Sequence, residues 1–164
     1  MNTININYTW NKDLAIKSAQ DIYEYELKSS NKRFIGWLMI ALVQFGVVGA
    51  LKHGVYGFLT LGTIGAIYWY WFRWPLRKFF ISKTFDKSPL ANKEIALEAK
   101  EDGIYSNEQL QIDYNNISKY AKLDDAIIIY HSLGTIYIPN DAFENHKFKN
   151  KFIQKLETLL TKKS

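Results

Sequence analysis

The sequence predicts an α+β membrane protein, in which a two-helix transmembrane hairpin is inserted near the start of a cytosolic β domain that closes with a helix. Two long apolar runs, strand patterns on both sides of them and an amphipathic C-terminal segment predict this fold. The expected parts are an N-terminal strand and helix joining the β domain (1–33), the hairpin (34–73), a basic interfacial connector (74–93), and the β domain with its closing helix (94–164).

The two apolar runs occupy residues 34–51 and 54–72, and only Lys52 and His53 separate them. As helices of about 1.5 Å per residue they would extend roughly 27 and 28 Å, close to the ~30 Å hydrocarbon thickness of a bilayer. Gln44 is their one strongly polar side chain, and we expect it to hydrogen-bond across the hairpin rather than to serve transport. Two buried helices of a soluble domain are the alternative, but such helices normally keep a polar stripe.

Basic residues set the expected orientation of the hairpin. The connecting loop offers only Lys52, whereas the outer ends of the two runs carry Lys28, Lys32, Arg33, Arg73, Arg77, Lys78 and Lys83. By the positive-inside rule both termini face the cytoplasm, which makes the chain a multi-pass protein of the cytoplasmic membrane. An aromatic belt is expected at the same interface, from Trp37, Trp69, Trp71 and Trp74.

The formal charge of +5 and the pI near 9.2 also reflect the basic residues that flank the apolar runs. Because so many basic residues flank the apolar runs, anionic lipid is the expected partner and nucleic acid is not. We expect headgroup contacts from a basic collar of Lys32, Arg33, Arg73, Arg77 and Lys78. The alternative is that these basic residues only fix the topology of the hairpin and bind no lipid headgroup.

Small residues recur four apart in each run, as Gly46 with Ala50 and Gly62 with Ala66. Such spacing lets two helix backbones approach closely, so we expect these faces to pack within the hairpin, with homodimerisation as the alternative. Pro75 predicts a kink after the second run, followed by a basic amphipathic stretch at the membrane surface.

The soluble part begins with a strand in which Ile4, Ile6 and Tyr8 alternate with polar residues, and Asn11 can cap the helix after it. A lone strand leaves backbone groups unpaired, so we expect it to pair with the sheet formed after residue 93.

About six strands are expected after the hairpin. Alternation at 95–99 and 110–114 and short runs at 117–123, 126–130 and 135–138 are separated by turns at 101–103, 124–125 and 132–134. The stretch 127–129 is apolar on both faces, which predicts a central strand, and Pro139 ends the sheet. The closing helix, starting between residues 140 and 145, would bury Phe148, Phe152, Leu156 and Leu159 or Leu160.

Several short motifs lie along this pattern. They are Tyr8-Thr9-Trp10 with Asp13 at the next helix, the hairpin, IDYNNI at 112–117, and IYIP at 136–139 followed by Phe143. Together they resemble the bacterial YcxB-like membrane proteins. The resemblance implies a soluble part similar to pleckstrin-homology-like domains and a location in the bacterial inner membrane, and it carries over no catalytic residue. Asn140 and Asp141 stand where the family has a basic pair, and Tyr114 where Trp is frequent.

No pattern of a catalytic or metal site emerges. His53, His131 and His146 lack metal-ligand spacing, Asp124-Asp125 is typical of a solvated turn, and there is no cysteine. We therefore expect no enzyme, no metal and no cofactor.

The expected function is a non-catalytic binding module held at the inner membrane, which engages a protein or a lipid headgroup. The alternative is a small membrane protein of the immunity type that binds and neutralises a toxin. An enzyme or channel would require polar residues that converge in one cleft or across the spans.

Overall fold

The computed structural model describes residues 3–31 and 33–161 and forms two compact units. The β unit comprises Met1–Asn11 and Leu90–Ser164, and the helical unit comprises Lys12–Pro89. The opening strand therefore belongs to the β unit, whereas the helix that follows it belongs to the helical unit.

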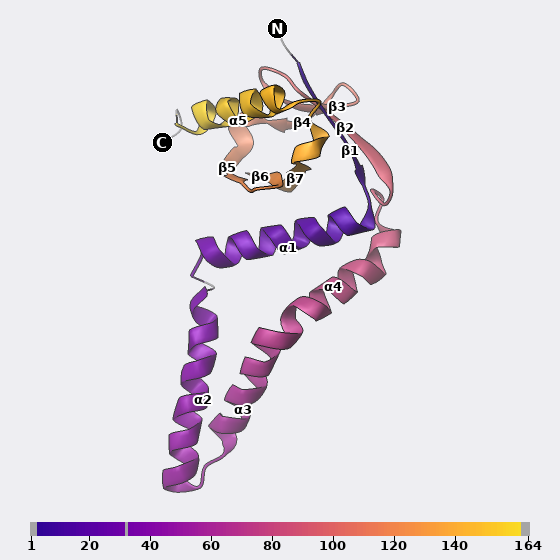
Figure 1. The fold of residues 1–164 in the computed structure, drawn as a ribbon. Helices are drawn as coiled ribbons and strands as arrows, with labels where there is room; N and C mark the ends of the chain where they lie inside the picture. Colours follow the sequence, from indigo (N-terminus) through magenta and orange to yellow (C-terminus); the bar gives the residue numbers. More distant parts are fainter. Residues whose placement is uncertain (1–2, 32, 162–164) are drawn as a thin grey trace. The chain divides into compact units, whose positions relative to one another are not determined.

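The β unit contains two antiparallel sheets (Figure 1). The first has the order β1-β2-β3-β4, with β1 (Ile4–Trp10), β2 (Lys93–Ala99), β3 (Gly103–Ser106) and β4 (Gln109–Asp113). The second has the order β5-β6-β7, with β5 (Ile117–Lys122), β6 (Ala126–His131) and β7 (Gly134–Pro139).

Strand β1 pairs with β2 along its whole length, from Ile4 opposite Ala99 to Trp10 opposite Lys93. This confirms the expected pairing across the inserted helices. The alternation predicted for β1 is also present, because Ile4 and Ile6 are buried while Asn5 and Asn7 are exposed.

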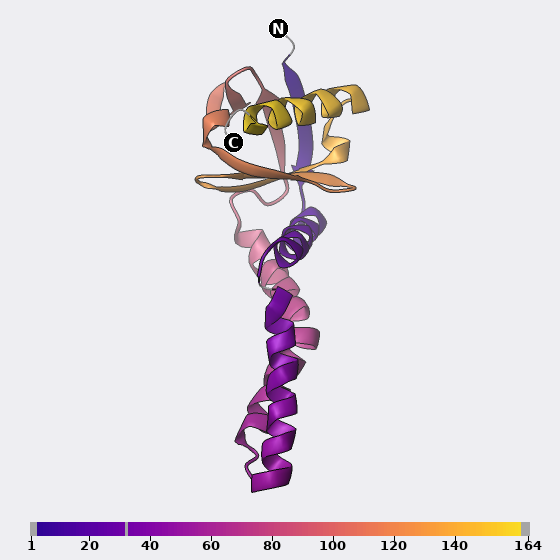
Figure 2. The same ribbon diagram turned by 90° about the vertical axis from the view of Figure 1, so that its left-hand side faces the viewer.

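The C-terminal helix α5 (His146–Thr161) covers the core of this unit (Figure 2). Phe152 and Leu156 are buried against Ile6, Ile127 and other core residues, as the apolar face of this helix predicts. The helix starts slightly later than expected because Asn140–Ala142 forms a 3-10 turn. The side chain of Asn145 then accepts a hydrogen bond from the Phe148 N–H at 3.0 Å, which caps the helix.

Two details of the strands differ from the prediction. Strand β3 was not located from the sequence, because its four residues are too few to show alternation. It joins β4 through Asn107 and Glu108, which have φ of 49° and 63°, as a tight hairpin requires. Strand β4 ends at Asp113, whose side chain accepts from the Asn115 N–H at 2.7 Å and starts a 3-10 turn.

The helical unit consists of α1 (Lys12–Ser29), α2 (Arg33–His53), α3 (Gly57–Ile67), the π-helix η1 (Tyr68–Phe72), α4 (Arg73–Thr84) and the 3-10 helix η2 (Phe85–Lys87). Helices α2 and α3 form a hairpin with close backbone contact. A methyl group on Gly46 would collide with the backbone of Leu59, and one on Gly62 would lie 3.0 Å from the Val43 nitrogen. The two glycines of the predicted small-residue pattern therefore pack within the hairpin.

Among the described residues, one helix is long and apolar enough to cross a membrane, at Phe34–His53. The second apolar run is divided, because α3 ends at Ile67 and η1 follows. Pro75 follows three residues after this segment, where it has no N–H for the Trp71 carbonyl and its ring crowds that carbonyl. Within the segment, the Arg73 N–H bonds to the Tyr68 carbonyl five residues back, one residue further than in an α-helix. The irregularity expected at Pro75 thus precedes it as a π-helical segment, and a second span remains a proposal.

The glycine contacts make a testable prediction. Alanine favours an α-helix over glycine by about 1 kcal/mol, yet Gly46→Ala should destabilise the hairpin because the new methyl group meets the Leu59 backbone. Gly49→Ala is the matched control, since its methyl group would meet only the Val55 carbonyl oxygen at 3.7 Å. Thermal unfolding in detergent should show a lower Tm for Gly46→Ala and an unchanged or higher Tm for Gly49→Ala. Equal Tm values for the two variants would contradict the close contact.

Candidate functional site

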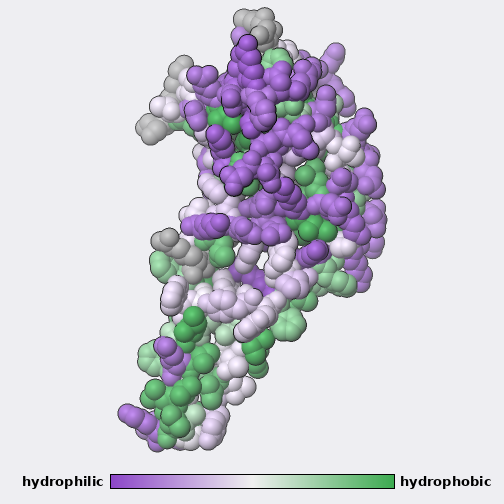
Figure 3. Space-filling model, viewed as in Figure 1, coloured by the Kyte–Doolittle hydropathy of each residue, from purple (hydrophilic) through white to green (hydrophobic). Residues whose placement is uncertain are grey.

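The hairpin exposes large apolar side chains on both of its helices (Figure 3). Phe45 and Leu51 of α2 are 74% and 82% exposed, and Leu61 of α3 is 70% exposed. Only 11% of the apolar window of α2 is buried, which differs from the core helix of a soluble protein. Soluble monomers rarely expose a contiguous apolar patch of more than a few hundred Å². This apolar surface is therefore one candidate contact surface of the chain.

A cluster of cations and aromatic rings lies in the helical unit, where α1 meets α4. The guanidinium of Arg73 lies 3.9 Å from the Trp69 ring centroid and 4.6 Å from that of Tyr23. Arg77 lies 5.4 Å from the same Tyr23 ring, and Trp74 stacks on Tyr23 with centroids 6.3 Å apart. Arg73 and Arg77 are four residues apart in α4, which places them on one face of that helix.

The cluster holds Arg73 more firmly than its neighbours. Its Nη1 atom is buried and has no hydrogen-bond partner among the described residues. The contacts of the guanidinium with the faces of Trp69 and Tyr23 therefore offset part of its lost hydration. A cation over an aromatic face gains about 0.5–1 kcal/mol when exposed and about 2 when desolvated. Arg77 and Lys78 are exposed. The predicted basic collar therefore contains one arginine packed between rings and two cations that remain open to a ligand.

The other predicted site residues are placed as follows. Lys32 lies outside the described residues, and Arg33 begins α2 with its side chain also outside the description. Of the expected belt, Trp69 and Trp74 join the cluster, whereas Trp37 and Trp71 are 70% and 69% exposed. The sequence did not identify Tyr23 as a functional residue, because it looks like one more apolar position of its helix.

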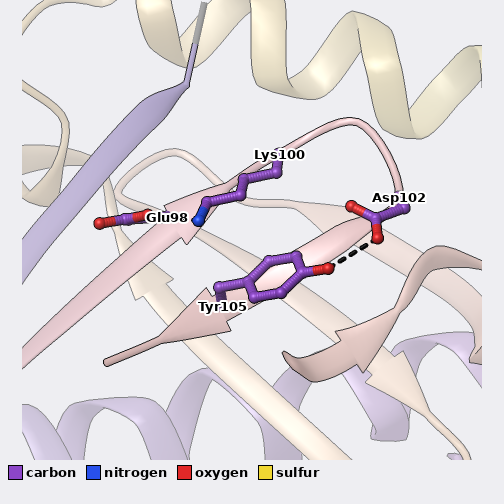
Figure 4. A network of polar contacts seen from close by, with 4 residues as sticks. All are labelled: Glu98, Lys100, Asp102 and Tyr105. Carbon is purple, nitrogen blue, oxygen red and sulfur yellow. Dashed lines mark hydrogen bonds and ion pairs between the residues drawn. The ribbon is translucent and has the colours of Figure 1, made fainter. Parts of the chain in front are cut away.

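The β unit contains a polar network at the turn between β2 and β3 (Figure 4). Lys100 forms an ion pair with Glu98 at 3.0 Å, and the Tyr105 hydroxyl donates to Asp102 at 2.6 Å. The Lys155 ammonium donates to the Lys100 carbonyl and lies 4.7 Å from the Tyr114 ring centroid. The network thereby ties α5 to this turn.

The electrostatics of the network follow from these contacts. The hydrogen bond from Tyr105 lowers the pKa of Asp102, and partial burial lowers the pKa of Lys155. No group of three or more potential metal ligands occurs in the part of the chain that the structure describes. Asp124-Asp125 forms a turn, with the Leu123 N–H donating to the Ala126 carbonyl at 2.9 Å, as expected.

Comparison with known proteins gives one family. The model for the family described as YcxB-like protein matches residues 100–156, which include strands β3 to β7 and most of α5. The YcxB-like resemblance predicted from the sequence is therefore confirmed. No curated protein and no solved structure matches the chain.

The Asp102 hydrogen bond predicts a pH effect. Because the folded state lowers the pKa of Asp102 below its ordinary value of 3.8, the associated stabilisation is present above that value and is lost as the pH falls through the folded pKa. In Tyr105→Phe, a carboxyl NMR titration should show the Asp102 pKa rising towards 3.8. Tyr120→Phe is the control, because that hydroxyl donates to Glu157 instead. An Asp102 pKa that is unchanged in Tyr105→Phe would contradict the assignment.

Proposed function

We propose, from the YcxB-like match as a premise, that this chain is a non-catalytic, multi-pass protein of the bacterial cytoplasmic membrane. Its hairpin crosses the bilayer twice, both termini are cytoplasmic, and the β unit is presented there for binding a protein or a lipid headgroup. The exposed apolar surface of α2 and α3 carries this proposal, because burying it in lipid removes its contact with water at about 25 cal/mol per Å².

The distribution of charge supports the orientation. Eleven Lys and Arg residues against five acidic ones give the helical unit a formal charge of +6, whereas ten lysines against eleven acidic residues give the β unit −1. The surplus of positive charge thus lies in the unit that contains the hairpin, and Lys52 is the only Lys or Arg at the tip. This asymmetry is what the positive-inside rule requires for cytoplasmic termini.

The same distribution divides the binding roles. Headgroup phosphates are recognised by clustered Lys and Arg, so we assign lipid contact to the open cations Arg77 and Lys78 of the helical unit. The almost neutral β unit is better suited to a protein partner. Its four-stranded and three-stranded sheets, followed by a C-terminal helix, support the similarity to pleckstrin-homology-like domains.

Topology is directly testable because the chain has no cysteine. His53→Cys places a thiol at the hairpin tip, and Ser132→Cys places one in the exposed turn between β6 and β7. In intact spheroplasts an impermeant maleimide should label the first variant, and it should label the second only after permeabilisation. If both thiols are protected until permeabilisation, the hairpin does not cross the membrane.

The role of the open cations predicts a lipid preference. In proteoliposomes, brominated phosphatidylglycerol should quench tryptophan fluorescence more than brominated phosphatidylcholine, because Trp69, Trp71 and Trp74 lie close to Arg77 and Lys78 in the chain. At about 1 kcal/mol per cation, Arg77→Ala combined with Lys78→Ala should reduce this preference severalfold, and rising salt should do the same. Lys52→Ala, at the other end of the hairpin, is the control. An unchanged preference in the double variant would leave the collar with a topological role alone.

A further inference from the structure

A cavity of about 430 Å³ lies within the β unit, between the two sheets. The core residue Ile6 forms a bridge to Phe143 and is fully buried beside α5. Two residues further along β1, Tyr8 lines the cavity instead, together with residues of β2, β4 and β7. The space between the two sheets is therefore occupied by core side chains near Ile6 and is open near Trp10.

The walls of the cavity are aromatic and aliphatic. Tyr8 and Trp10 meet edge to face, with ring centroids 6.5 Å apart and planes at 66°. Leu97 and Tyr137 are buried, and Ile136 is half-buried. Such walls favour a flat aromatic body, because offset and edge-to-face ring contacts add about 0.5–1.5 kcal/mol to the burial of area.

The rim offers uncharged hydrogen-bonding groups. Ser106, Asn107, Gln111 and Thr135 all line the cavity, and the last three are exposed. Burial raises the pKa of Tyr8 to about 12, so its hydroxyl keeps its proton at any physiological pH. Amide and hydroxyl groups of a ligand would find both donors and acceptors here.

The charges at the cavity exclude a polyanionic ligand. Among the residues that the structure describes, Lys93 and Glu94 are the only charged ones that line the cavity, and they are of opposite sign. Recognition of a phosphorylated headgroup relies on several convergent cations, which this cavity does not provide.

We propose that the cavity is a binding site for an uncharged aromatic small molecule that carries amide or hydroxyl groups. Its volume lies within the roughly 300–1,000 Å³ of ligand pockets, and apolar walls with a few polar groups are their usual composition. This site goes beyond the proposed membrane function, because it lies wholly in the β unit and uses neither the hairpin nor the collar.

The test uses the full chain in nanodiscs of neutral lipid, with empty nanodiscs as the blank. The probe is N-acetyltryptophanamide, which joins an indole to two uncharged amides. N-acetyltryptophan keeps the indole but adds a carboxylate, and inositol hexakisphosphate represents a polyanion. Ligand-observed NMR should show saturation transfer to the amide probe above the blank and weaker transfer to the carboxylate. Any transfer to the polyanion should come from the collar, so filling the cavity should leave it unchanged.

Two variants fill the cavity from its exposed rim. Thr135→Trp should reduce the signal of the amide probe by about fivefold or more, because the new indole takes up the space of the ligand. Thr9→Trp is the matched control, since Thr9 is exposed on β1 and does not line the cavity. Gln111→Trp, on a different strand, provides the test if circular dichroism shows that Thr135→Trp is unfolded.

Binding of the amide probe that is lost in a folded rim variant and kept in Thr9→Trp would establish the site. Transfer no greater than to empty nanodiscs, binding that survives in the folded rim variants, or equal binding of the carboxylate would overturn the proposal. None of these outcomes depends on which way the hairpin crosses the membrane.

Discussion

The pairing of β1 with β2 is the interaction on which the rest of the structure depends. The chain leaves the first sheet after Trp10 and returns at Asn92, whose N–H donates to the Trp10 carbonyl at 2.9 Å. The helical unit is thus an insertion between two paired strands. Loop-closure entropy grows only with the logarithm of length, and the inserted segment is itself folded, so the long separation in sequence costs the sheet little. Without β1 the sheet would lose a complete strand and the fully buried side chain of Ile6.

Much of this arrangement was predictable because its signals are local. Period-two alternation located β1, β2 and β4, and short runs between turns located β5 and β7. The apolar run at 127–129 located the central strand β6, and the spacing of Phe152 and Leu156 identified the buried face of α5. Strand β3 was not located because four residues show no period, and its turn uses Asn107 and Glu108 rather than glycine. The π-helical segment also gives no periodic signal, since its five residues are all aromatic.

The binding features were harder to predict, because they depend on residues that are distant in sequence. Tyr23 is one aromatic residue among several in its helix, and only the packing of α1 on α4 shows that it contacts Arg73, Arg77 and Trp74. The cavity likewise combines β1, β2, β3, β4 and β7 from two sheets. Ser106 and Thr135 carry no sequence signal of a binding site. They share a role only because both line the space between the two sheets.

The cation cluster explains how two arginines are tolerated at the start of α4. A free helix N-terminus carries a partial positive charge, which would repel Arg73 and Arg77. No free terminus exists here, because the Arg73 N–H bonds to the Tyr68 carbonyl and η1 continues into α4 without a break. The faces of Trp69 and Tyr23 then provide the negative potential that the Arg73 guanidinium needs. The π-helical segment next to Pro75 thus both divides the second apolar run and allows positive charge to be placed directly beside it.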